Sequence, residues 1–365
     1  MMAALSEVIK MCLRVMAVKE TKGKELYKKI VWRKLVLVIS LAVTCALTLL
    51  LDISTGPSQL SLFEVFSTII SPNHSDPVTH TIIWTIRLPM ALMAIVVGAA
   101  LGVAGAEMQT ILNNPLASPY TLGVSAGAGF GAALAIVLGA GVIPYIGEFV
   151  TSINAFIFSL LTCLLIYLIA KAGRMAAETM ILAGIAVTLL FHSLLALLEY
   201  IASPEALQAI VFWLFGSLTK ATLLKVGITS VGLLAVVAFL STRVWRLTAL
   251  RLGDEKAKSL GINVEKLRLE VFICVSLLTA VAVCFVGTIG FIGLVGPHIA
   301  RMCVGEEQRF FLPMSLLGGA VTLSAASVIS KLVVPGIYFP IGIITSLIGL
   351  PFFLSIILMK RRGYW

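Results

Sequence analysis

The chain has 365 residues, of which 59% are hydrophobic and only 12% are charged, and its mean hydropathy is +1.07. A soluble domain of this length would need far more polar surface, so the composition excludes an ordinary globular enzyme and indicates a membrane protein. The formal net charge of +10 does not indicate a nucleic-acid partner, because it reflects where the basic residues lie along the chain.

Ten stretches of the sequence are long and apolar enough to cross a membrane. A helix rises about 1.5 Å per residue and the hydrocarbon core is about 30 Å thick, so about 20 mostly apolar residues suffice. The apolar runs are continuous rather than alternating, which favours helices over a barrel. The sequence therefore predicts an all-α polytopic membrane protein with helices at roughly 35–51, 87–111, 120–140, 148–171, 178–201, 224–243, 267–287, 290–304, 312–332 and 340–359.

The Lys and Arg residues predict the orientation of these helices. With the amino terminus inside and ten crossings, 23 of the 27 basic residues fall on cytoplasmic segments, which is the positive-inside pattern. Both termini are therefore expected in the cytoplasm. The expected division is a basic amino-terminal segment at 1–34 that could also contact anionic lipid, a membrane domain at 35–360 and a short tail at 361–365.

Two stretches are too rich in glycine and proline for ordinary lipid-facing helices. In GTIGFIGLVGPHIAR, at 287–301, glycine recurs every third residue and is followed by Pro297. Both residue types destabilise helices, so a bent or broken element packed against its neighbours is expected. The stretch NNPLASPY at 113–120 predicts an irregular turn. Glycines at every fourth position, at 98–102 and 123–131, favour close helix packing.

Few ionisable residues lie within or near the apolar spans. Glu107, His192 and Glu199 are candidates for function, because charges inside a membrane are costly and often functional. Alternatively, both glutamates reach water at the ends of their helices and His192 is a hydrogen-bonded packing residue.

No catalytic or metal site is recognisable in the sequence. It contains no GxxxxGK[ST] or HExxH motif, so the chain has no P-loop of its own for ATP. The six cysteines lie in or beside apolar helices without metal-like spacing, and we interpret them as packing residues. The expected protein is not an enzyme and needs no cofactor. Active transport would then draw on an ion gradient or on a partner that hydrolyses ATP.

The segment RLGDEKAKSLGINVEKLRLE, at 251–270, differs from the rest of the chain because nine of its twenty residues are charged. Asp254 is expected to cap a short helix and Gly261 to end it. A helix this short is unstable alone, so burial against a partner would explain it. Ala257 and Leu260 are the residues expected to face that partner.

The sequence resembles the permease subunits of bacterial ABC importers for iron–siderophore, haem and cobalamin, the FecCD-type or type II importers. The resemblance covers about 35–360 and implies a ten-helix permease with the cobalamin-permease fold. It also implies pairing with a second permease, two cytoplasmic ATPases and an external substrate-binding protein. It rests on RLP (87–89), GAALGVAGAEMQ (98–109), NNPLASPYTLGVSAGAG (113–129), ILAGIAV (181–187), WLFGSL (213–218), ALRLGDEKAKSLGINV (249–264), GTIGFIGLVGPHIAR (287–301) and PIGIITSLIGLPFF (340–353).

On the cytoplasmic side, the resemblance implies two functional segments. Residues 249–264 correspond to the loop that docks on the ATPase, and the turn between the fourth and fifth predicted helices corresponds to the cytoplasmic gate. An acidic residue is unusual at such a gate. The expected coupling residues are Leu252, Gly253, Asp254, Glu255, Ala257, Leu260 and Gly261, and the expected gate residues are Ala176, Ala177, Glu178 and Thr179.

On the external side, Arg87 resembles an arginine that meets an acidic patch on the binding protein, and Lys331 is a second basic position. Met90 and Tyr338 stand where the family often has an arginine and a glutamate. Arg87 and Lys331 themselves are expected to be exposed charges that steer docking of the binding protein in a salt-dependent way.

The resemblance implies import of a large iron chelate, foremost a ferric siderophore, across the cytoplasmic (inner) membrane of a bacterium or archaeon. Haem, cobalamin and molybdate remain alternatives, because specificity resides largely in the separate binding protein. A distant alternative is a proton-coupled secondary transporter that uses Glu107, His192 and Glu199. It accounts neither for the charged segment 251–270 nor for the motifs.

Overall fold

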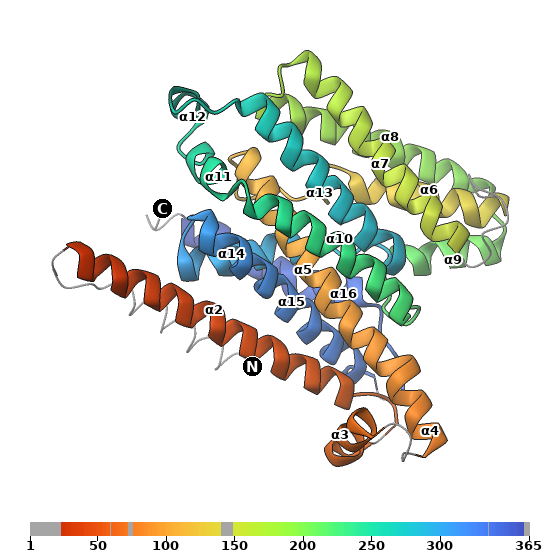
Figure 1. The fold of residues 1–365 in the computed structure, drawn as a ribbon. Coiled ribbons are helices and arrows are strands. Elements are labelled where there is room, and N and C mark those ends of the chain that lie inside the picture. The colour runs from red at the N-terminus through yellow and green to blue at the C-terminus, as the bar shows by residue number, and fades with distance from the viewer. Residues whose placement is uncertain (1–22, 59, 72–75, 140–148, 335, 361–365) are drawn as a thin grey trace.

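A computed structural model describes residues 23–58, 60–71, 76–139, 149–334 and 336–360. These residues form helices and connecting turns, with no strand among them, which confirms the predicted all-α polytopic fold (Figure 1). Most of the predicted amino-terminal segment and the tail at 361–365 lie outside the described residues.

All ten predicted helices are present. Seven helices among the described residues are long and apolar enough to cross a membrane, whereas α6, α14 and the apolar part of α16 are shorter. The ten are α2 (Gly23–Ser54), α5 (Leu88–Ile111), α6 (Val124–Leu138), α7 (Val150–Ala172), α8 (Ala177–Ile201), α10 (Leu223–Ser241), α13 (Val264–Val286), α14 (Ile292–Val304), α15 (Gln308–Leu332) and α16 (Ile341–Lys360).

Shorter elements lie between these helices. A four-residue helix, α4 (Pro77–His80), and a π-helix, η2 (Thr81–Arg87), continue into α5 as one rod from 77 to 111. α3 (Leu62–Ile70) begins with a capping box, in which Ser61 and Glu64 satisfy each other's backbone amides. The remaining short helices are α9 (Pro204–Leu214), α11 (Val244–Leu250) and α12 (Asp254–Ser259).

Helix α5 runs through the centre of the bundle, with α2 along one side and α6, α7 and α8 along the other (Figure 1). Nearly every α5 residue from Pro89 to Ile111 is buried. Glycine permits this close packing. A methyl carbon at Gly105 would overlap the backbone carbonyl of Gly293, and one at Gly98 would lie 2.5 Å from the carbonyl oxygen of Gly319. The predicted packing role of small residues is confirmed at these contacts.

The glycine-rich stretch at 287–301 is a broken element, as predicted. α13 ends at Gly287, with φ +75°, and α14 starts after Phe291, which has φ +66°. The break therefore precedes α14, whereas Pro297 lies inside that helix.

The two ends of the bundle carry different elements. The start of α2, the end of α16, α11 and α12 share one end, and α3, α4 and α9 lie at the other (Figure 1).

Candidate functional site

The charged segment folds into the short helix α12, which has well-defined ends. Gly253, with φ +100°, precedes the helix and Gly261, with φ +79°, follows it. The Gly261 N–H donates to the Lys258 carbonyl (2.9 Å) and the Ile262 N–H to the Ala257 carbonyl (3.1 Å), which is the Schellman pattern. Gly261 therefore ends the helix, as predicted.

The prediction that Asp254 caps this helix is wrong. Asp254 is the first residue of α12, and the N-cap position, Gly253, has no side chain to accept a hydrogen bond. The Asp254 carboxylate instead accepts two hydrogen bonds from Arg268 on α13, at 2.7 Å and 2.8 Å. This two-pronged pairing of a carboxylate with a guanidinium is the strongest common form of side-chain ion pair.

Arg268 connects three segments that are far apart in the sequence. Its Nε donates to the carbonyl of Ile111 at the end of α5 (2.8 Å), and its Nη1 donates to the carbonyl of Met175 before α8 (3.3 Å). Together with the bonds to Asp254, these contacts join α12, α5 and the α7–α8 turn. The Arg268 residue is 4% exposed, so water competes little for these bonds.

Sequence reasoning did not single out Arg268, although a signal was present. The buried face of α13 includes Val264, Leu267, Val271 and Phe272, and Arg268 falls on that same face. A charged residue on the apolar face of a helix requires partners, but the sequence does not say which partners those are.

The predicted gate residues lie where the α7–α8 turn enters α8. Arg174 and Met175 both have left-handed backbones, with φ +52° and +56°. Ala176 is the N-cap of α8 and Ala177 its first residue. Glu178 is exposed, whereas Ala176, Ala177 and Thr179 are partly buried. The turn is linked to α12 through Arg268, which brings the predicted gate and coupling segments together.

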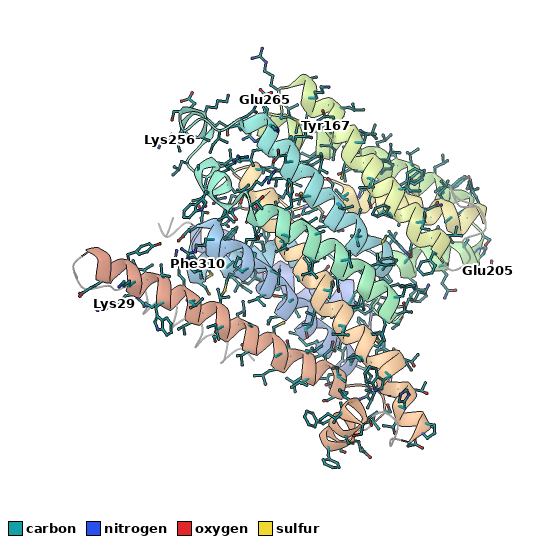
Figure 2. The ribbon with its side chains drawn as sticks, viewed as in Figure 1. Lys29, Tyr167, Glu205, Lys256, Glu265 and Phe310 are labelled. Atoms are coloured by element: carbon teal, nitrogen blue, oxygen red, sulfur yellow. The ribbon has the colours of Figure 1, made fainter. Side chains whose placement is uncertain are left out.

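The surface of α12 differs in part from the prediction. Ala257 is completely buried in the core of this chain, so it cannot face a partner as expected. Leu252 and Leu260 are 58% and 63% exposed, and they are the apolar residues that remain available. Figure 2 shows Lys256 and Glu265 at this end of the bundle and Glu205 at the opposite end.

A second charged cluster holds the start of the coupling segment. Glu306 pairs with both Arg251 and Arg301, and Arg301 also donates to the side-chain oxygen of Gln109 (2.7 Å). Burial lowers the pKa of the Arg251 guanidinium, and the nearby Glu107 carboxylate opposes that shift. The segment is therefore fixed at Arg251 as well as at Asp254.

The three candidates for proton transfer are placed differently from one another. Glu107 on α5 is completely buried, and neither carboxylate oxygen has a hydrogen-bond partner among the described residues. The alternative in which Glu107 reaches water is therefore wrong. His192 is exposed on α8 and Glu199 is partly buried there. Within the described residues, no hydrogen bond joins any two of the three.

The expectation that Arg87 and Lys331 are exposed is also wrong. Arg87 is completely buried and donates to backbone carbonyls at the end of α2 and just after it, including that of Ser54 (2.9 Å). The Lys331 ammonium pairs with the Asp52 carboxylate at 2.7 Å, with both side chains fully buried. Burial raises the pKa of the Tyr338 hydroxyl, and nearby Arg87 opposes that shift.

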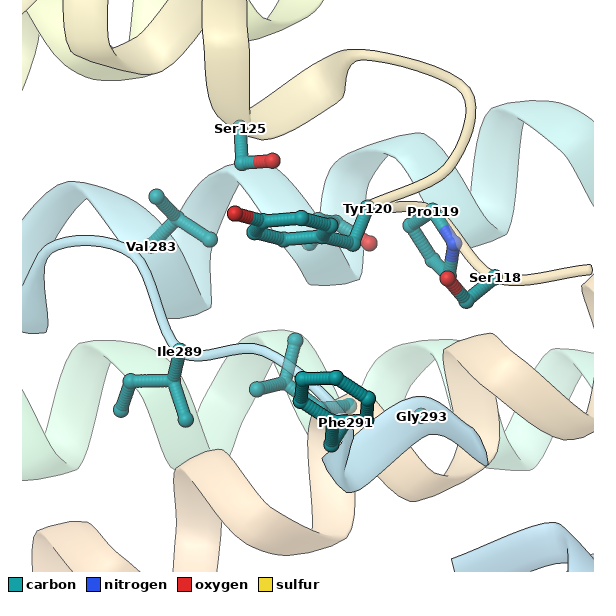
Figure 3. Close-up of a pocket in the computed structure, with 10 residues that line it drawn as sticks. Ser118, Pro119, Tyr120, Ser125, Val283, Ile289, Phe291 and Gly293 are labelled. Atoms are coloured by element: carbon teal, nitrogen blue, oxygen red, sulfur yellow. The ribbon is translucent and has the colours of Figure 1, made fainter. Parts of the chain in front are cut away.

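One small cavity lies beside the break between α13 and α14 (Figure 3). Its volume is about 20 Å³, enough for a water molecule but far too small for a metal chelate. No three His, Cys, Asp or Glu side chains in the described ranges come together in a way that could hold a metal ion. The cavity is lined by Leu101, Ser118, Pro119, Tyr120, Ser125, Thr279, Val283, Ile289, Phe291 and Gly293.

Known proteins similar to this chain are ABC permeases. An ABC transporter permease protein of Methanocaldococcus jannaschii is 38% identical over 343 residues, which are 92% of this chain and 98% of that protein. The hemin transport system permease HmuU of Yersinia pestis is 36% identical over 318 residues, covering 87% of this chain and 95% of HmuU.

A solved structure of an ABC transporter has a fold similar to that of this chain. A metal-chelate type ABC transporter in an inward-facing conformation superposes with a TM-score of 0.78 at 31% identity, covering 88% of this chain and 99% of the other. The model of the FecCD transport family matches residues 44–360. The chain therefore belongs to the FecCD transport family and is a multi-pass membrane permease of the ABC-importer type.

Proposed function

We propose that this chain is the membrane subunit of an importer that moves an iron chelate, foremost a ferric siderophore, across the cytoplasmic membrane by alternating access. A separate ATPase supplies the energy and an extracytoplasmic binding protein delivers the substrate. The observation that carries this proposal is α12, a short helix that is flanked by exposed Leu252 and Leu260 and anchored to the bundle by Arg268.

The surface of α12 fits a protein partner. Leu252 and Leu260 offer exposed apolar contacts, and Glu255, Lys256 and Lys258 are exposed around them. An apolar centre with a charged rim is the usual composition of a protein–protein interface. The sequence has no P-loop, so a docked ATPase is the proposed energy source and the chain itself is a transport subunit rather than an enzyme.

We place the cytoplasmic gate at Ala176, Ala177, Glu178 and Thr179. Arg268 links Asp254 of α12 to the carbonyl of Met175, the residue directly before the gate residues. This supports the assignment, because a movement of the docked ATPase would reach the start of the gate through one side chain. The orientation with α12 in the cytoplasm rests on the distribution of the 27 basic residues.

A second permease copy is the proposed partner within the membrane. The cavity beside the α13–α14 break is too small for a chelate, and we infer that the pathway forms between two chains. α8 and α16 have broad exposed apolar faces, with Leu189 at 63% and Leu347 at 66% exposed. Membrane lipid covers whichever of these faces the second copy does not.

We propose that the external surface around Arg87 and Lys331 receives the binding protein. Both side chains are buried, so they hold the end of α2 and the residues after it in place rather than offer free charges. Docking should then depend less on salt than exposed charges would imply.

The substrate assignment rests on relatives. HmuU is named for hemin transport and the similar solved structure is described as a metal-chelate type ABC transporter, which supports an iron chelate or haem. Haem, cobalamin and molybdate remain the alternatives to a ferric siderophore.

Proteoliposomes that contain this chain with its ATPase and binding protein would test the proposal. Uptake of a ⁵⁵Fe-labelled ferric siderophore should require ATP and survive a protonophore, with haemin, cobalamin and molybdate as the comparison substrates. Uptake that needs a proton gradient but no ATP would support the secondary transporter instead.

A further inference from the structure

We propose that Arg268 is the positioning residue that transmits movement of α12 to the α7–α8 turn and to the end of α5. This inference rests on the proposed function, because it assigns the route by which an ATPase bound at α12 would act on the gate. It concerns a residue of α13 that lies outside both the predicted coupling loop and the predicted gate.

The hydrogen bonds of Arg268 use most of its guanidinium group. Nε donates to Ile111, Nη1 to Met175 and Asp254, and Nη2 to Asp254. An arginine has five N–H donors in a fixed plane, and four donor–acceptor contacts are present here. Because the plane is rigid, a displacement of Asp254 tilts the whole group and changes the bonds to both backbone carbonyls.

The α12 end of the link is stiff. Ala257 is buried with no exposed surface, and the Schellman contacts of Gly261 and Ile262 close the end of the helix. A push on the exposed side chain of Leu260 therefore moves α12 as one unit, and Asp254 moves with it. The Asp254 side chain is 42% exposed, so it lies at the border between the docking surface and the buried arginine.

At the gate end of this link, the backbone of the α7–α8 turn has an unfavourable conformation that other contacts must stabilise. Arg174 and Met175 have positive φ values, which cost about 1 kcal/mol or more per non-glycine residue. The Arg268 bond to the Met175 carbonyl is one of the contacts that offset this cost. If that bond weakens, the turn can relax, and the start of α8 at Ala177 follows it.

The end of α5 is the third point of contact. The last carbonyls of a helix have no partner within the helix, and the Arg268 Nε satisfies that of Ile111 at 2.8 Å. α5 is the most central helix of the bundle. The same arginine therefore couples α12 both to the gate and to the core.

The ratio of substrate transported to ATP hydrolysed tests this inference in the reconstituted complex. A misfolded fraction lowers transport and hydrolysis in proportion and leaves the ratio unchanged, whereas a broken link lowers the ratio. The probe is whichever of ferric siderophore, haemin, cobalamin or molybdate the wild-type complex imports fastest.

Two variants break the link, and a third serves as the control. Asp254→Asn keeps the shape of the side chain but removes its charge, and Arg268→Lys keeps the charge but loses the planar fork. Both should lower the ratio about tenfold while ATPase binding stays near the wild-type level. The control, Glu270→Gln, breaks the Arg243–Glu270 pair two residues away on the same helix, and its ratio should stay unchanged.

Several results would overturn the inference. A wild-type ratio in both link variants would do so, as would an equal loss in Glu270→Gln. Parallel loss of assembly, hydrolysis and transport in Asp254→Asn, whose side chain is partly exposed, would reduce Arg268 to a structural role. Failure of the wild-type complex to hydrolyse ATP for transport would overturn the proposed function itself.

Discussion

The Asp52 carboxylate and the Lys331 ammonium form an ion pair of 2.7 Å in which both side chains are fully buried. Lys331 also donates to the Asp52 carbonyl, and Ser327 donates to the carboxylate (2.8 Å). The pair joins the end of α2 to the end of α15, two helices that are far apart in the sequence. It explains why a lysine lies at a position where the sequence suggested an exposed docking charge.

Lys331→Met should therefore destabilise the protein strongly. It would leave the Asp52 carboxylate buried without a partner, and losing one member of a buried pair costs about 3–5 kcal/mol. The double variant Asp52→Asn/Lys331→Met should be less harmful than the single one, because no charge is left unpaired. Thermal unfolding in detergent would measure both, and a single variant as stable as the wild type would contradict this assignment.

Gly105→Ala should lower the thermal stability, because a methyl carbon there would overlap the backbone carbonyl of Gly293. The α5 backbone would have to move away from the start of α14. Gly227→Ala on α10 is the matched control, since its methyl carbon would meet no atom within 4 Å. The control should be neutral or stabilising by up to about 1 kcal/mol, because alanine favours helices over glycine. Equal effects of the two changes would show that close packing at Gly105 is not needed.

Gly261→Ala should impair transport while leaving the fold intact. Its φ of +79° costs a non-glycine residue about 1–2 kcal/mol, which would loosen the end of α12. Gly261→Pro should be more severe, because it also removes the N–H that donates to Lys258. The control is Gly336→Ala, which has a similar φ of +84° and equally open surroundings, in the α15–α16 connection. ATP-driven uptake should fall only for the Gly261 variants, and normal uptake in Gly261→Pro would count against a coupling role for α12.

Leu260→Ala should weaken binding of the ATPase about tenfold or more, because it removes apolar surface that the interface would bury, at about 0.8 kcal/mol per methylene group. Leu234→Ala on α10 is the matched control, because the residue is 67% exposed compared with 63% for Leu260. Titration of the purified chain with the ATPase would give both affinities. If the two changes had the same effect, Leu260 would not lie in the interface.

The sequence predicts the helices of this protein well and the partners of its charged residues poorly. Continuous apolar runs fix where a chain can cross a membrane, so hydropathy located all ten helices, including the short α14. Glycine spacing likewise identified the break at Gly287. The positions of the helices and of this break depend on local composition, which can be read directly from the sequence.

The partners depend on which helices meet, and local composition does not specify this. Asp254 looked like a helix cap because its partner, Arg268, is fourteen residues away on the next helix. Lys331 looked exposed because its partner, Asp52, lies on α2. Ala257 looked available to a partner, but its side chain packs into the core of the chain. In each case a tertiary contact overrides a sound local expectation.

Site-specific photocross-linking from position 260 in intact cells tests the central claim most directly, since that claim is that a separate ATPase docks on α12. Tyr200, 87% exposed near the far end of α8, provides the control position. The account predicts that the adduct formed at position 260, identified by mass spectrometry, contains a protein with a P-loop motif, and that position 200 yields no such adduct. Absence of the P-loop protein at position 260, or its capture equally at position 200, would contradict the account.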